Sequence, residues 1–144
     1  MSVTRAATFC AFSAGVVTTP AVGAQKVAAR VADMARRSYL KVLGVIENMS
    51  AFVAPDGSRH EIFGAGGGKR LAALTGAPLV GSVPIEPAVS ADGDAGNPVV
   101  IAHPDDPAAV AIAAIATRIF EELLPPVEMA GCTARMFDLV NKLA

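Results

Sequence analysis

A glycine-rich stretch at residues 64–69, Gly-Ala-Gly-Gly-Gly-Lys, is the part of this chain most similar to a phosphate-binding loop. Such a loop has a glycine, any four residues, then Gly-Lys and a Ser or Thr. If Gly68 and Lys69 are that pair, the first glycine falls at Phe63 and the hydroxyl for Mg²⁺ at Arg70. Neither Phe63 nor Arg70 is the residue type that the pattern requires. We therefore interpret the stretch as a structural loop that opens a helix and could at most bind an anion weakly.

A single amide, Asn48, follows an unbroken apolar run at residues 42–46 that is typical of a buried parallel strand. Ligands of open α/β sheets bind outside the carboxyl ends of the strands. An Asn there offers both a donor and an acceptor to the edge of a purine. A turn-forming Asn at a strand end is the common alternative. Taken alone, Asn48 favours the turn.

A second candidate segment, Val-Pro-Ile-Glu-Pro at residues 83–87, follows the next predicted strand. Its prolines fix a rigid loop, and Pro84, Ile85 and Glu86 could pack against a flat ring. By itself this segment is equally typical of an ordinary connection.

The residues that could ligate a metal are scattered. Cys10 and Cys132 lie near opposite ends of the chain, and His60 and His103 are isolated. We predict neither a metal site nor a catalytic residue. Cys132 is the better candidate for a reactive thiol, but a passive thiol is the preferred interpretation, because reactivity requires a lowered pKa. Two distant cysteines do not make a disulfide scaffold, which favours a reduced, cytoplasmic setting.

The elements that must position these residues alternate between strand and helix. We expect strands at residues 14–19, 42–46 and 78–83, and helices at 20–37, 69–75 and 107–124, with a short helix and loop at 86–96. This order predicts parallel βαβ units in a three-layer α/β sandwich. Residues 48–68 are expected to form a long loop. The first strand is expected to leave an apolar edge open.

Two of the predicted helices carry apolar residues at spacings of three and four, which indicates one apolar face on each. These residues are Val27, Val31 and Met34 in the first helix, and Ile112, Ile115, Ile119 and Leu123 in the last.

Composition narrows the functional classes. The net charge is −1 and aromatic residues make up 5%, so neither a basic stripe nor a stacking platform for nucleic acid is expected. No apolar run reaches the ~18 residues of a membrane span. Residues 1–24 have the outline of a secretory signal peptide with cleavage after Ala24. We favour a buried strand at residues 14–19 over that alternative, because later segments repeat the same unit.

Several short motifs in a fixed order carry a resemblance to a known family. They are Thr18-Thr19-Pro20 and the segments at residues 44–50, 62–68, 81–87 and 93–100. Together they resemble the Mrp/ApbC family over residues 13–124. Its members are P-loop ATPases related to MinD, and they carry iron–sulfur clusters for assembly onto target proteins. The resemblance implies that Asn48 faces the adenine of ATP and that Pro84, Ile85 and Glu86 line the other side of the base.

Two departures from the family pattern limit what the resemblance implies. The phosphate loop and the acidic residues that hold Mg²⁺ do not occur in this sequence, so we expect no hydrolysis by this chain alone. The family's Cys-x-x-Cys pair, which bridges a [4Fe–4S] cluster between subunits, has no counterpart in residues 52–58. The cluster is thus implied by resemblance only, with its ligands absent, and ATP binding is expected to be weak or to depend on a partner.

The sequence therefore predicts the C-terminal part of a P-loop NTPase parallel sheet at residues 13–124. Residues 1–12 stay unassigned, and residues 125–144 are expected to form a helical tail. The predicted function is that of a truncated or split ATP-binding iron–sulfur cluster carrier. The alternative is a non-catalytic module that pairs with a P-loop-bearing partner. Expected partners are a second copy or such a partner, and iron–sulfur client proteins, but neither nucleic acid nor membrane.

Overall fold

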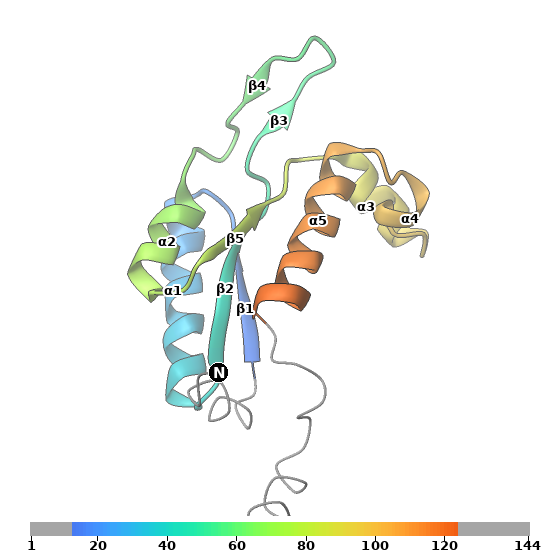
Figure 1. Cartoon of the computed structure of the whole chain (residues 1–144). Helices are drawn as coiled ribbons and strands as arrows, with labels where there is room; N and C mark the ends of the chain where they lie inside the picture. The colour runs from blue at the N-terminus through green and yellow to red at the C-terminus, as the bar shows by residue number, and fades with distance from the viewer. Residues whose placement is uncertain (1–12, 124–144) are drawn as a thin grey trace, which may run out of the picture.

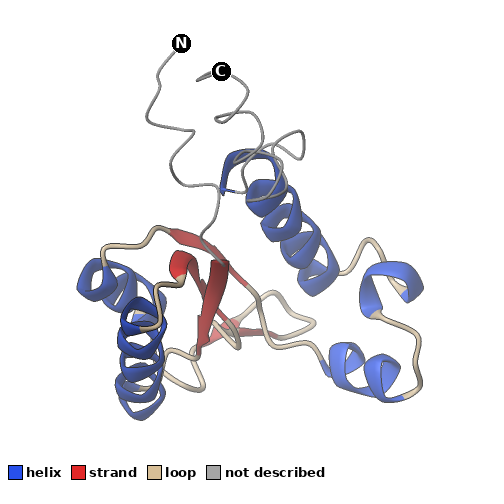
Figure 2. Cartoon of the chain, turned by 90° about the horizontal axis from the view of Figure 1, so that it is seen from below, coloured by secondary structure: helices blue, strands red, loops and turns tan. Residues whose placement is uncertain are grey.

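A three-stranded parallel sheet forms the middle layer of the computed structural model, which describes residues 13–123. The strands lie in the order β1-β2-β5 and comprise β1 (Ser13–Thr18), β2 (Lys41–Glu47) and β5 (Leu79–Ser82). Helices α1 (Val22–Arg37) and α2 (Gly67–Thr75) cover one face. Helix α5 (Pro107–Arg118), which continues as the π-helix η2 (Ile119–Leu123), covers the other (Figures 1 and 2). The predicted three-layer α/β class is confirmed.

The strands begin and end within one or two residues of their predicted limits. β1 pairs with β2 along its whole length, from Ser13 opposite Lys41 to Thr18 opposite Glu47. β5 pairs only with the carboxyl-terminal half of β2, from Val45 opposite Leu79 to Glu47 opposite Ser82. All three strands therefore end at the same edge of the sheet.

Two hydrophobic cores lie on the two faces of the sheet. The core under α1 and α2 contains Val16, Ala28, Ala32, Val45, Leu71 and Ala77. The core under α5 contains Val80, Val83, Ala108 and Ile115, with Ile112, Ile119 and Leu123 packed against it. The apolar face predicted for the last helix is therefore confirmed.

Helix α1 differs from expectation, because its core-facing residues are Ala28, Ala32 and Ala35. The branched and long residues predicted to form its apolar face are exposed instead, at 60% for Val27, 44% for Val31 and 62% for Met34. The physical reason is the close approach of α1 to the sheet, for which small alanine side chains leave room. The apolar face exists, but it projects beside the free edge of β1 rather than onto the described core.

The long loop expected at residues 48–68 contains a β-hairpin that the sequence analysis missed. Strand β3 (Phe52–Val53) pairs with β4 (Arg59–His60), and the hairpin extends from the carboxyl-terminal edge of the sheet (Figure 1). The dipeptides Pro55-Asp56 and Gly57-Ser58 form its tip. The Pro-Asp-Gly sequence at residues 55–57 is a turn signal and could have identified the hairpin.

The connection from β5 to α5 holds two short helices, α3 (Pro87–Asp94), which was expected, and α4 (Val99–Ala102), which was not. They lie on the α5 side of the sheet (Figure 1). The predicted tail helix, residues 1–12, Cys10 and Cys132 fall outside the described residues. Within residues 13–123, the helices are all too short or too polar to cross a membrane.

Candidate functional site

The candidate site lies where the three strands end, and backbone hydrogen bonds hold the following segments together there. Asn48 N donates to Thr18 O over 2.7 Å, and Val83 N donates to Glu47 O over 2.8 Å. Further along, Ser50 N donates to Val83 O over 3.0 Å. The segment after β2 is thus joined to the segments after β1 and after β5. The two candidate segments predicted from sequence therefore lie next to each other.

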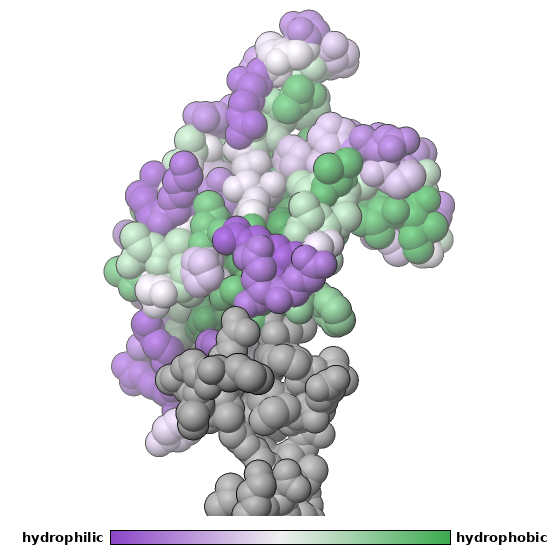
Figure 3. All heavy atoms as spheres, in the orientation of Figure 1, coloured by the Kyte–Doolittle hydropathy of each residue, from purple (hydrophilic) through white to green (hydrophobic). Residues whose placement is uncertain are grey.

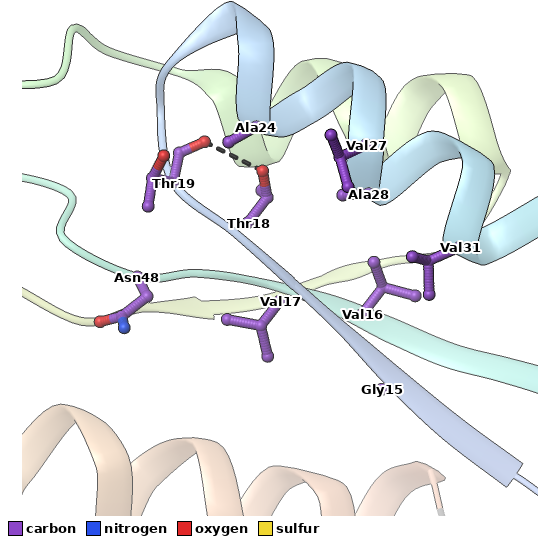
Figure 4. Close-up of a pocket in the computed structure, with 10 residues that line it drawn as sticks. All are labelled: Gly15, Val16, Val17, Thr18, Thr19, Ala24, Val27, Ala28, Val31 and Asn48. Carbon is purple, nitrogen blue, oxygen red and sulfur yellow. Dashed lines mark hydrogen bonds between the residues drawn. The ribbon is translucent and has the colours of Figure 1, made fainter.

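Asn48 is half-buried at the end of β2. Its Oδ1 accepts a hydrogen bond from Met49 N over 2.9 Å, and Met49 adopts a left-handed backbone with φ 55°. Its Nδ2 group donates to no residue within 13–123. In Figure 4 the amide lies beyond the end of β2, on the side of the sheet from which Val17 projects and away from α1. The side chain forms a turn and still has a donor to offer to a ligand.

The residues after β5 form a braced, half-buried loop. Ile85 N donates to Ala51 O over 2.8 Å, and Ile85 forms a parallel bridge with Phe52 at the base of the hairpin. Glu86 is the N-cap residue of α3, but its side chain makes no capping hydrogen bond. Pro84, Ile85 and Glu86 are all partly accessible. The loop is therefore positioned by the hairpin, and its side chains are not all used in packing.

Glu47, which the sequence analysis did not single out, is a buried acid beside this site. Its exposed fraction is 7%, and its Oε2 accepts the backbone N–H of Gly68 in the first turn of α2. A Cβ at Gly68 would lie 2.7 Å from Glu47 Cβ, and a Cβ at Gly67 would lie 2.6 Å from Pro20 Cα. An acid at the end of an apolar strand was the signal available in the sequence.

These contacts explain the glycine-rich stretch. Its glycines allow α2 to pack closely on the turn after β1 and on the end of β2. The Gly68 N–H is already occupied by a carboxylate, whose negative charge disfavours a phosphate at the same place. The interpretation as a structural loop that opens a helix therefore agrees with the geometry.

A hollow of about 430 Å³ runs along the free edge of β1. Its lining is mostly apolar and consists of Gly15, Val16, Val17, Thr18, Thr19, Ala24, Val27, Ala28, Val31 and Asn48 (Figure 4). Within residues 13–123, β1 pairs on one side only, with β2. The expected apolar edge is therefore present, and Asn48 lies at one end of it.

The described residues do not fit the ligand set of an iron–sulfur cluster. No cysteine occurs within residues 13–123, and no three His, Cys, Asp or Glu residues there lie close enough to hold a metal ion. The hairpin tip instead carries Asp56, whose Oδ1 accepts from Ser58 Oγ over 2.6 Å and from Ser58 N over 2.9 Å. The Ser58 hydroxyl, followed by the Ser58 backbone N–H, lowers the pKa of Asp56 below its ordinary value.

The family match and the similar sequences all point to proteins of iron or iron–sulfur cluster transfer. Residues 2–120 match the protein family described as ParA, the NUBPL iron-transfer P-loop NTPases. The chain is 48% identical over 105 residues to a protein named iron-sulfur cluster carrier protein from Deinococcus radiodurans. It is 38% identical over 107 residues to a protein of the same name from Saccharolobus solfataricus. The matches cover 72% and 74% of this chain but only 29% and 36% of those relatives.

Solved structures support the same fold. The chain is similar to the cell division ATPase MinD of Pyrococcus furiosus, with a TM-score of 0.62 and 20% identity, over 76% of this chain and 42% of that one. MinD of Aquifex aeolicus gives a TM-score of 0.58 at 23% identity, over 83% of this chain and 48% of that one. The residues matched in each case are thus less than half of a MinD chain.

Proposed function

Because the chain belongs to the ParA family of iron-transfer P-loop NTPases, we propose that it supplies the base-binding part of an ATP site in an iron–sulfur cluster carrier. The observation that carries this proposal is the Asn48 amide, whose Nδ2 group has no partner within residues 13–123. It stands beside the braced loop of Pro84, Ile85 and Glu86 at the carboxyl ends of the strands, where ligands of open α/β sheets bind.

The chemistry of Asn48 matches adenine. An adenine edge presents an amino donor next to a ring-nitrogen acceptor, and an amide can satisfy both. Asn48 Oδ1 accepts one backbone N–H and keeps a second lone pair, while Nδ2 is free to donate. Pro84 and Ile85 would pack against the flat face of the base. The residues therefore supply recognition of the base, in agreement with the resemblance.

In this proposal, residues outside this chain bind the phosphates and catalyse hydrolysis. ATP hydrolysis by a P-loop NTPase uses a lysine, a Mg²⁺-binding hydroxyl and a positioned water. The only glycine-rich stretch has Arg70 where that hydroxyl would be, and its Gly68 N–H is bound by Glu47. We therefore propose that this chain alone does not hydrolyse ATP. The cluster would be cargo bound through other residues, in a cytoplasmic assembly that contains a P-loop-bearing partner or a second copy.

Titration of the ¹⁵N-labelled chain with ATP, adenosine and guanosine, followed by NMR, tests the base site directly. Since only the base is held, ATP and adenosine should bind with affinities within about threefold of each other, and guanosine should bind more weakly. Asn48→Ala should remove the preference for adenosine. Asn97→Ala, which changes an exposed amide in the connection between α3 and α4, is the matched control and should leave binding unchanged.

Two results would contradict the proposal. ATP turnover by the purified chain would show that hydrolytic residues exist which the sequence pattern does not reveal. Adenosine binding that survives Asn48→Ala, or that shifts resonances only far from residues 48 and 84–86, would show that the base is held elsewhere.

A second candidate function is favoured by the free edge of β1. Val17 is 57% exposed, and together with Val27 and Val31 it borders the hollow along that edge. An edge strand that has no neighbouring strand on one side within residues 13–123, and that lies beside exposed apolar side chains, is a template for another strand. In this alternative the chain is a non-catalytic module whose β1 pairs with a strand of a P-loop-bearing partner, and nucleotide binding is that partner's property.

Co-expression with the part of the Deinococcus radiodurans relative that this chain does not match separates the two functions, if that part holds the proposed phosphate loop. Stable co-purification that Val31→Asp abolishes, with no adenosine binding by the chain alone, would favour the interaction module. Adenosine binding by the chain without any partner would favour the base site.

A further inference from the structure

The two layers of helices on the sheet carry opposite charge. α1 and α2 together have a net charge of +5, from Lys26, Arg30, Arg36, Arg37, Lys69 and Arg70 against Asp33. The helices on the other face, α3, α4, α5 and η2, have a net charge of −3, from Asp92, Asp94, Glu121 and Glu122 against Arg118. The whole chain has a net charge of −1, so the positive charge is concentrated on one layer.

A groove of about 460 Å³ lies between α1 and α2 in this positive layer. It is lined by Val22, Gln25, Lys26, Ala29, Arg30, Arg70, Leu71 and Leu74. Leu71 is buried, whereas Val22 and Leu74 are 63% and 70% exposed. The groove therefore combines apolar walls with three cations and has no acidic residue among its lining. None of its lining residues belongs to the candidate site at Asn48 and residues 84–86. Figure 3 shows hydrophilic and hydrophobic residues intermixed over the side of the molecule on which α2 lies.

The cations of the groove are not neutralised within the described part of the chain. No carboxylate there lies within 4 Å of the charged groups of Lys26, Arg30 or Arg70. The acid of α1, Asp33, pairs instead with Arg36 and Arg37 near the end of the helix. Arg70 is held in place, because its Nε donates to Gln25 Oε1 over 3.3 Å. Gln25 Nε2 in turn donates to Pro20 O over 2.7 Å. A guanidinium fixed in this way keeps its remaining N–H groups for a carboxylate.

We propose that the α1/α2 groove is a docking site for an acidic amphipathic helix of a partner protein. Apolar side chains at every third and fourth position of such a helix would fill the space between Val22, Ala29 and Leu74. Flanking Asp or Glu side chains would meet Lys26, Arg30 and Arg70. α1 is 16 residues long, about 24 Å at 1.5 Å per residue, so a partner helix of roughly four turns could lie along it. The concave shape favours a helix over a flat membrane surface.

A fluorescent peptide of about 14 residues, with Leu at helical spacing flanked by Glu, is a suitable probe for anisotropy titrations with the full chain. Arg30→Glu should weaken binding by about tenfold, because it replaces an attraction by a repulsion. Lys69→Glu is the matched control, since Lys69 is exposed on α2 but does not line the groove. It should change the affinity less than about threefold.

A charge exchange makes this test independent of folding defects. The Arg30→Glu chain should regain affinity for a peptide in which the Glu facing Arg30 is replaced by Lys, which damage to the fold would not permit. NMR shifts should map to α1 and α2. Equal losses from Arg30→Glu and Lys69→Glu, shifts along β1 instead, or no peptide binding would each overturn the proposal. Capture of the chain by phosphatidylglycerol vesicles without peptide binding would also overturn it, in favour of a membrane surface.

Discussion

The two sides of α1 meet very different surroundings. On one side of α1 lies α2, which packs so closely on the turn after β1 and on the sheet that Gly67 and Gly68 have no room for a Cβ, and Glu47 binds the start of α2. On the other side, along β1, Val27 and Val31 border an open hollow. We refer to the first region as the closed side and to the second as the open side.

The comparison shows that side-chain size does not predict burial in α1, whose buried residues are alanines. The closed side is built with alanine and glycine, because small residues let helices and strands approach each other. Helix α1 leaves Val27, Val31 and Met34 exposed, although a periodicity argument assigns such residues to a core. An apolar face that is left exposed next to the edge strand β1 indicates where further structure could pack. The predictions below test this contrast, beginning with the closed side.

Gly67→Ala should produce the largest effect. The new Cβ would lie 2.6 Å from Pro20 Cα and 2.7 Å from Pro20 O, and backbone atoms cannot move aside as a side chain can. We expect the free energy of unfolding to fall by about 3 kcal/mol, at the upper end of the usual overpacking cost. Urea denaturation followed by circular dichroism measures it.

Gly23→Ala is the control for Gly67→Ala. Gly23 lies in the first turn of α1, and its added Cβ would meet nothing within 4 Å. Alanine is the better helix former, so stability should stay the same or rise by up to about 1 kcal/mol. Equal losses from both substitutions would mean that the closed side is no more tightly packed than the surface of α1.

Glu47→Ala should have the next largest effect. It leaves the Gly68 N–H buried without an acceptor, which costs about 1–3 kcal/mol. Glu47→Gln keeps an acceptor oxygen and should lose less. Urea denaturation of both variants gives the difference, and hydrogen exchange at Gly68 should accelerate only in the alanine variant. If both variants are equally destabilised, the carboxylate charge matters more than the hydrogen bond.

Much of this architecture was predictable because it depends on local patterns. A strand is predicted by the apolar run at residues 42–46 alone. A helix with one buried face is predicted by the spacing of Ile112, Ile115 and Ile119 alone. The hairpin at residues 52–60 escaped prediction, because two-residue strands leave almost no periodic signal. The turn at Pro55 to Ser58 was the only usable sign.

The site was predictable to a lesser degree. Asn48 and Pro84 follow neighbouring strands, so their proximity follows from the order of elements alone. The bond between Glu47 and Gly68 joins residues 21 positions apart and depends on how α2 packs on the sheet. No spacing rule contains that information. The positive charge of the α1/α2 groove likewise comes from two helices that are distant in the sequence, so it becomes apparent only when they pack side by side.

Val31→Ser tests the open side. Val31 is 44% exposed, and the helix propensities of Val and Ser are similar. The free energy of unfolding of the isolated chain should therefore change by less than about 0.5 kcal/mol. If β1 pairs with a P-loop-bearing partner, the same substitution should weaken that association. A loss of about 2 kcal/mol in the isolated chain would show instead that Val31 is part of the core.

Asp56 provides the smallest expected effect and the sharpest contrast with Glu47. Both carboxylates accept a backbone N–H, but Asp56 is fully exposed at the hairpin tip. Hydrogen bonds from the Ser58 hydroxyl and then the Ser58 N–H lower its folded-state pKa below the ordinary 3.8. Because the folded pKa is depressed, the ionised form stabilises the hairpin above pH 3.8. That contribution is lost as the pH falls through the folded pKa.

An NMR titration of the Asp56 carboxyl carbon checks this behaviour. Ser58→Ala removes the first cause and should raise the pKa of Asp56 toward 3.8, without a change in the urea midpoint of the whole chain at neutral pH. Solvent screens an exposed pair, so the effect should stay within the hairpin. If Ser58→Ala instead lowered the urea midpoint as much as Glu47→Ala does, the hairpin would be coupled to the closed side. The two regions would then unfold as one unit.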